Sequence, residues 1–148
     1  MPRFILFVRA SENSEVKFIP SQELFQAMSQ YNDALLEAGV FIAGEGLLPS
    51  ARVGQRVVFH DDDRGPTIES GPFPMNELVS GWWILTVKDV EEATAWAKKC
   101  PMMKEGDVLE IRKISEADDF GSAMTQEMRE KEEAMRMESE KLEKGGQN

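Results

Sequence analysis

The sequence predicts an α+β fold in which two strand–helix–strand units build one sheet. Two continuous apolar runs, Phe4 to Val8 and Gly81 to Val87, have the composition of buried strands. A helical pattern and then a further strand pattern follow each run. The length of 148 residues suits a single domain that buries its own core.

The first unit is predicted from the N-terminal strand to about residue 43. After Pro20, Ser21 is placed to cap a helix that ends at Gly39. Its apolar residues recur at helical spacing along one face: Leu24, Met28, Tyr31, Leu35 and Ala38. Val40 to Ala43 then reads as a second strand, which runs into Gly44-Glu45-Gly46.

A hairpin is predicted between the two units. Arg56 to His60 and Thr67 to Glu69 are its strands, and the acidic run from Asp61 to Gly65 is its loop. Asp61, Asp62 and Asp63 lack the spacing of a calcium loop, so the sequence predicts a solvated turn.

The second unit consists of the Gly81 to Val87 strand, a helix capped by Asp89 and ended by Pro101, and a last strand. That strand, Val108 to Ile114, points Leu109 and Ile111 inward and Glu110 and Arg112 outward, which indicates an edge or a half-exposed position.

Both apolar strands carry apolar side chains on both of their faces, so both faces of the sheet need cover. Two helices on one face give a ferredoxin-like doubled βαβ sandwich. The same face of a second subunit is the simplest cover for the other, and a dimeric α+β barrel is therefore expected.

A separate C-terminal segment is predicted beyond the body, with the α+β domain at residues 1–119 and the segment at 120–148. Between Met124 and Lys144 it carries paired charges four residues apart, and Met128, Met135 and Leu142 form a seven-residue stripe. We expect an added amphipathic helix whose last four residues are frayed.

Charge and cysteine content narrow the functional classes. The net charge is −10, and an acidic body repels phosphate backbones, so no nucleic-acid partner is expected. The apolar run near the N-terminus is too short for a signal sequence or a membrane span. Cys100 is the single cysteine, which suits a reducing, cytoplasmic location.

An ordered set of short motifs resembles the YCII-related family in its DGPF branch. The set comprises Gly44-Glu45-Gly46-Leu47, Gly71-Pro72-Phe73, Glu77, Gly81-Trp82-Trp83, Cys100-Pro101 and Ala117 to Gly121. The resemblance runs from about residue 3 to about residue 142. It implies a dimer of ferredoxin-like protomers whose sheets face each other and leave a cleft.

This chain departs from that family at positions that bear on chemistry. Ser70 stands where the branch has the Asp of Asp-Gly-Pro-Phe. A His and Asp pair has been proposed as an active site in the smaller relatives, and the matching positions here are Met28 and Cys100. The resemblance therefore implies no such dyad in this chain.

Glu45 and Ser70 are the candidate catalytic residues. Glu45 is flanked by glycines at the end of an apolar strand, where it can act as a general acid or base, or can stabilise a turn. Ser70 is a possible polarising donor. His60, the single histidine, is a possible neighbour across the hairpin, but the sequence has no nucleophile-elbow motif.

Phe73, Trp82 and Trp83 are the candidate ligand-binding residues. The rigid Gly-Pro-Phe-Pro turn fixes Phe73 as part of a pocket wall or an interface. Trp82 and Trp83 point to opposite faces of their strand, one under the helices and the other toward the cleft or the partner subunit. Cys100 is expected to pack the end of its helix, and no metal site or cofactor is predicted.

The sequence therefore favours a small homodimeric protein with a cleft for a small, largely apolar molecule. Its chemistry, if any, is predicted to be of the cofactor-free lyase, isomerase or dehydratase class. The alternative is an interaction or regulatory accessory protein that acts through its dimer surface and its C-terminal helix.

Overall fold

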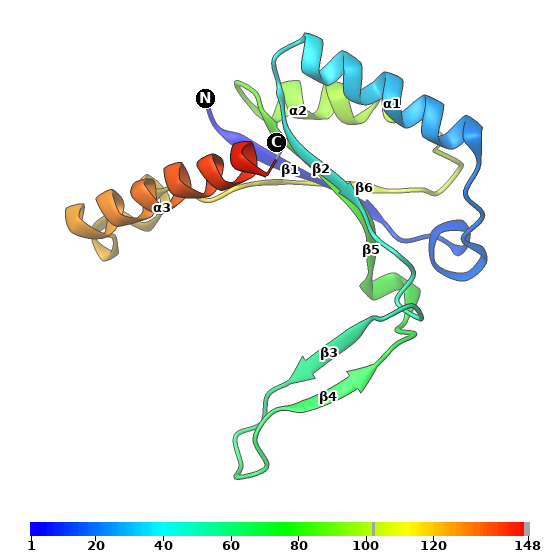
Figure 1. Cartoon of the computed structure of the whole chain (residues 1–148), viewed down its shortest axis with the longest axis horizontal. Helices are drawn as coiled ribbons and strands as arrows, with labels where there is room; N and C mark the ends of the chain where they lie inside the picture. Colours follow the sequence, from blue (N-terminus) through cyan, green and yellow to red (C-terminus); the bar gives the residue numbers. More distant parts are fainter. Residues whose placement is uncertain (102, 147–148) are drawn as a thin grey trace. The chain divides into compact units, whose positions relative to one another are not determined.

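The computed structural model describes residues 1–101 and 103–146 and falls into two compact units, Met1–Ile114 and Ser115–Asn148 (Figure 1). The predicted order of strand, helix, strand, hairpin, strand, helix, strand is confirmed in the first unit. The predicted boundary after residue 119 falls within η3 (Ala117–Ala123), a 3₁₀ helix of the second unit.

Four antiparallel strands form the main sheet of the first unit. In spatial order they are β2 (Phe41–Gly46), β5 (Val79–Thr86), β1 (Arg3–Arg9) and β6 (Leu109–Lys113). Since β1 and β2 are both antiparallel to β5, they are parallel to each other with β5 between them, and β5 and β6 are related in the same way across β1. This is a doubled, split βαβ arrangement, with β6 at an edge as predicted.

Two helices cover one face of this sheet (Figure 1). The first, α1 (Gln22–Glu37), begins where the Ser21 hydroxyl accepts a hydrogen bond from the Leu24 N–H at 3.1 Å. The second, α2 (Val90–Ala97), begins where the Asp89 carboxylate accepts from the Glu92 N–H at 2.9 Å. Both predicted caps are therefore confirmed.

The core lies between these helices and the sheet. It contains ten buried side chains: Phe4, Leu6, Tyr31, Leu35, Val40, Trp83, Leu85, Val87, Ala93 and Cys100. Tyr31 and Leu35 are the fully packed members of the face predicted for α1, whereas Ala38 at its end is exposed. The Trp83 indole N–H donates to the Asn32 side-chain oxygen at 2.8 Å, and the Tyr31 ring meets the indole edge-to-face at 5.1 Å.

The central hairpin is a sheet of its own. It consists of β3 (Gln55–Val58) and β4 (Thr67–Ser70), and it extends away from the four-stranded sheet (Figure 1). Two short helical segments of the first unit are η1 (Glu12–Lys17) and η2 (Met75–Glu77).

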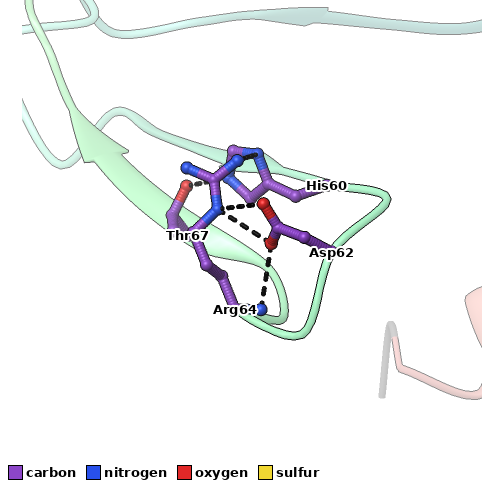
Figure 2. Close-up of polar contacts among 4 residues, drawn as sticks. All are labelled: His60, Asp62, Arg64 and Thr67. Carbon is purple, nitrogen blue, oxygen red and sulfur yellow. Dashed lines mark hydrogen bonds and ion pairs between the residues drawn. The ribbon is translucent and has the colours of Figure 1, made fainter.

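Figure 2 shows the loop of the hairpin, where Arg64 lies between Asp62 and His60. Arg64 Nε donates to both Asp62 carboxylate oxygens at 2.8 Å, and Arg64 Nη2 lies 3.0 Å from His60 Nδ1. The hydrogen bonds that the Arg64 side chain and the Arg64 backbone N–H donate to Asp62 lower the pKa of its carboxyl group. Because a guanidinium only donates, His60 Nδ1 accepts, and His60 Nε2 carries the proton toward Thr67 Oγ1 at 2.8 Å.

The second unit contains the expected C-terminal helix, α3 (Gln126–Gly145), whose N-cap is Thr125. Arg129 joins it to the preceding η3 segment through an ion pair of 2.7 Å with Asp118. The side chains of the predicted stripe, Met128, Met135 and Leu142, are exposed. None of the helices in the described residues has the length and apolar content that a membrane crossing requires.

The packing of the core leaves room for glycine alone at position 44. A Cβ atom there would lie 2.6 Å from the Trp83 ring, whereas a Cβ atom at Gly46 would meet nothing within 4 Å. We predict that Gly44→Ala lowers the free energy of unfolding by about 1–3 kcal/mol, because the indole must shift from its packed position. Gly46→Ala is the control.

Urea denaturation measures both variants, and Gly46→Ala should stay within about 0.5 kcal/mol of the parent protein. Equal losses in the two variants would show that strand flexibility, and not contact with the indole, sets the preference for glycine.

Candidate functional site

The face of the main sheet opposite α1 and α2 carries a cluster of large apolar side chains. In β1 and β5 the residues that alternate with the core are Ile5, Phe7, Trp82 and Ile84, and all four are half-buried. We call these four residues, together with the edge carboxylates Glu45 and Glu110, the open face. Neither α-helix of the first unit lies on it (Figure 1).

The register of the strands places one glutamate at each edge of the open face. Glu45 of β2 pairs with Trp82, Trp82 pairs with Phe7, and Phe7 pairs with Glu110 of β6. Directly paired residues of antiparallel strands share a face of the sheet, so these four side chains form one row across it. The row therefore has an aromatic centre and a carboxylate at each end.

The two carboxylates of the row have different surroundings. Glu110 accepts from Arg9 Nη1 at 3.2 Å and lies 3.6 Å from Arg112 Nη1, and Arg9 also donates to the Asn76 carbonyl oxygen at 2.6 Å. Glu45 is exposed, and within residues 1–101 and 103–146 no group donates to its carboxylate. Of the two carboxylates in this row, Glu45 is therefore the one without a hydrogen-bond partner in the described residues.

Only one of the two candidate tryptophans lies on the open face. Trp82 points there, while Trp83 is 7% exposed and packs under the helices against Tyr31 and Asn32. The sequence predicted that the pair would divide between the faces, and strand alternation does divide them. The core position of Trp83 leaves Trp82 as the tryptophan of the pair that a ligand on the open face can contact.

Ser70 lies away from the open face. It is exposed in β4 and pairs with Gln55, in a sheet different from the one that holds Glu45. His60 contacts Thr67 and Arg64, so the hairpin does not bring Ser70 and His60 together as a catalytic pair. The structure therefore does not unite the two candidate catalytic residues in one site of one chain.

Phe73 belongs to a second region, which is centred on Ser50. The buried Ser50 hydroxyl donates to Glu15 and accepts from the Phe73 N–H at 2.9 Å. The Ser50 N–H also donates to both Glu15 carboxylate oxygens, at 2.9 and 3.0 Å. Ser50 thereby ties together η1, the connection between β2 and β3, and the Gly71 to Phe73 turn.

The turn fits closely onto Ser50. The Gly71–Pro72 peptide bond is cis, and a Cβ atom at Gly71 or Gly54 would collide with the Ser50 carbonyl oxygen. Arg56 stacks over the Phe73 ring, with its Cζ atom 4.1 Å from the centroid, and forms an ion pair of 3.0 Å with Glu77. The Phe73 ring therefore contacts the Arg56 guanidinium, and its backbone N–H is bound to Ser50.

Cys100 is buried at the end of α2 and borders an open pocket of about 310 Å³ beside β6. Burial raises the pKa of its thiol to about 11, so very little thiolate exists at neutral pH. Burial, together with the nearby Cys100, also raises the pKa of Tyr31, whose hydroxyl donates to the Trp96 carbonyl oxygen at 2.8 Å. In the described residues no group of three or more acidic, histidine or cysteine side chains is placed to hold a metal ion.

Several residues of these regions were not predicted from the sequence. The outward alternation of Glu110 and Arg112 in the last strand was a usable signal for the charged edge of the open face. Glu15 and Ser50 gave no signal, because they lie 35 residues apart in segments without a regular pattern.

The fold defines an α+β protein in which two helices cover one face of a four-stranded antiparallel sheet. A family model described as the YCII-related domain matches residues 3–120. The chain therefore belongs to the YCII-related family. A search of curated proteins found no match.

We predict that Ser50→Ala destabilises the protein by about 1–3 kcal/mol, because the half-buried Phe73 N–H loses its acceptor and the Glu15 carboxylate loses the Ser50 hydroxyl as a donor. The exposed Ser70→Ala is the matched control and should change stability by less than about 0.5 kcal/mol. Thermal and urea unfolding of both variants make the comparison. A loss at Ser70 as large as that at Ser50 would contradict this account of the turn.

The raised pKa of Cys100 predicts that its thiol reacts slowly with alkylating reagents at neutral pH. Alkylation by iodoacetamide at pH 8 should be far slower in the folded protein than in the urea-unfolded chain, since the thiolate is the attacking species. In the folded protein the rate should rise steadily as pH increases toward 11. A rate that levels off near pH 8 would show an ordinary, accessible thiol.

Proposed function

We propose that this protein binds a small, largely apolar molecule on the open face, with Trp82 as the contact surface and Glu45 as the group that moves a proton. The observation that supports this most is the direct pairing of the half-buried Trp82 with an exposed carboxylate, Glu45, that has no partner in the described residues. A half-buried aromatic ring beside one polar group is typical of small-molecule sites.

The chemistry proposed is of the cofactor-free lyase, isomerase or dehydratase class. A molecule held flat on Trp82 presents the hydrogen of a carbon next to a carbonyl group to the Glu45 carboxylate. Glu45 takes that proton, and the electron pair moves toward the carbonyl oxygen. Return of the proton to another carbon gives isomerisation, and departure of a group from the next carbon gives elimination.

Ser70 is not part of this proposal. Its position opposite Gln55 in the hairpin puts it in a different sheet from Glu45. The hydrogen-bond donor that polarises the carbonyl oxygen is therefore another group on the open face, and not Ser70.

A second copy of the chain is proposed to cover the open face and to close the site into a cleft. The apolar centre formed by Phe7, Trp82 and Ile84 supports this, because large apolar surfaces rarely remain uncovered. The Gly71-Pro72-Phe73 turn further supports placement in the DGPF branch, although Ser70 departs from the Asp of that motif. The single buried Cys100 is consistent with a cytoplasmic location.

One observation favours a second candidate function. The stripe of α3, formed by Met128, Met135 and Leu142, is exposed along its length. A methionine-rich apolar helix face is suited to binding another protein. An accessory protein that recruits a partner through α3 is therefore the competing proposal.

The ring ketone 2-cyclohexen-1-one is a suitable probe for the catalytic proposal. The parent protein should accelerate exchange of its ring hydrogens for deuterium in D₂O, followed by proton NMR. Glu45→Gln keeps the size of the side chain and removes the base, so we predict that it lowers the exchange rate by roughly 10²–10⁴-fold. Trp82→Ala should act mainly by raising KM, because it removes the contact surface.

Glu69→Gln, which removes an exposed carboxylate of the hairpin, is the matched control and should exchange at the parent rate. Full activity in Glu45→Gln would dispose of the proton transfer. If the probe neither exchanges nor shifts the backbone amide signals of β5, the partner-recruiting role of α3 is favoured instead.

A further inference from the structure

A second pocket, separate from the open face, lies beside Ser50. It has a volume of about 440 Å³, within the range of small-molecule sites. Four parts of the chain form it: η1 through Glu15, the connection from Gly46 to Gln55, the turn at Phe73, and the start of β5 at Val79. We call it the Ser50 pocket.

The walls of the Ser50 pocket are largely apolar. Leu47, Leu48 and Val79 line one part, and Phe73 lines another. Leu47 and Leu48 are both substantially exposed, at 44% and 57%, so they present carbon surface that a ligand can cover. This lining calls for a ligand with an apolar body.

Two arginines, Arg52 and Arg56, line the same pocket, and their charges are compensated differently. Arg56 is held between Glu77 and the Phe73 ring. Arg52 lies over the Phe18 ring at 5.0 Å, and in the described part of the chain no carboxylate is within ion-pair distance of it. One positive charge at this pocket is therefore unpaired in a protein whose net charge is −10.

The acidic residue of the pocket does not neutralise that charge. Both oxygens of Glu15 accept from the Ser50 backbone N–H, and one also accepts from the Ser50 hydroxyl, so this carboxylate is engaged within the fold. Its negative charge also disfavours a ligand with several negative charges. A single negative charge fits the pocket best.

The turn that carries Arg52 is held in a fixed shape. The Arg52 N–H donates to the Pro49 carbonyl oxygen at 2.8 Å, and the Gly54 N–H donates to Ser50 at 3.2 Å. Between them Val53 has a φ of 64°, a left-handed conformation that a β-branched residue rarely adopts. Val53 is 95% exposed, so its own side-chain packing does not explain the strain.

We propose that the Ser50 pocket binds a small monocarboxylate with an aliphatic or aromatic body, whose carboxylate pairs with Arg52 and whose body lies on Leu47, Leu48 and Val79. A guanidinium presents two parallel N–H donors to a carboxylate, which gives both affinity and orientation. The site is independent of the open face and of any reaction there.

Octanoate is the probe, and octanamide is its neutral counterpart of nearly equal shape. In ¹⁵N-labelled protein, octanoate should cause saturable shifts at the amides of Ser50, Phe73 and Val79. Arg52→Gln should weaken octanoate binding by roughly tenfold or more, because the charge-assisted pair is lost, and should leave octanamide binding unchanged. Arg64→Gln, which alters an exposed arginine of the hairpin loop, should bind octanoate like the parent.

Trp82→Ala distinguishes binding in the Ser50 pocket from binding on the open face. Because Trp82 does not line the pocket, this variant should bind octanoate like the parent. The proposal is overturned if octanoate shifts none of the three amides, if octanamide binds as tightly as octanoate, or if Arg52→Gln binds octanoate with the parent affinity. Shifts confined to β1 and to Trp82 and Ile84 of β5 would overturn it too, because they would place the probe on the open face.

Discussion

The alternation of side chains along β1 and β5 is the constraint on which the rest of the structure depends. Successive residues of a strand point to opposite faces, so the apolar runs of these two strands place apolar side chains on both faces of the sheet. The helices α1 and α2 cover the face that holds Leu6, Trp83 and Leu85, which are all buried. The same register leaves Phe7 and Trp82 on the other face and brings Glu45 and Glu110 to its edges.

A second, local constraint comes from Ser50. Its hydrogen bonds to Glu15 and Phe73 join three segments that have little regular structure of their own. Gly71 and Gly54 lie against its carbonyl group, where no larger residue fits. The Gly-Pro-Phe turn is thus explained by packing, and Ser70, which stands just before it, faces solvent in the hairpin.

Much of the fold could be predicted because its strongest elements carry local patterns. The strands β1 and β5 were visible as apolar runs, and Ser21 and Asp89 marked the starts of α1 and α2. The site was harder to predict, since it depends on register between distant strands. Sequence alone showed that Trp82 and Trp83 must face opposite ways, but only the positions of the helices decide that Trp83 is the buried one. Nothing in the sequence showed that Ser70 and Glu45 would occupy different sheets.

We propose above all that the open face binds a small molecule, with Trp82 as the contact surface and Glu45 as the group that moves a proton. A crystal structure of the protein with 2-cyclohexen-1-one tests it most directly. We expect the ring of the ligand to lie against the Trp82 indole, with a ring carbon within reach of the Glu45 carboxylate. An open face filled completely by side chains of a second copy, with the ligand bound elsewhere or absent, would contradict it.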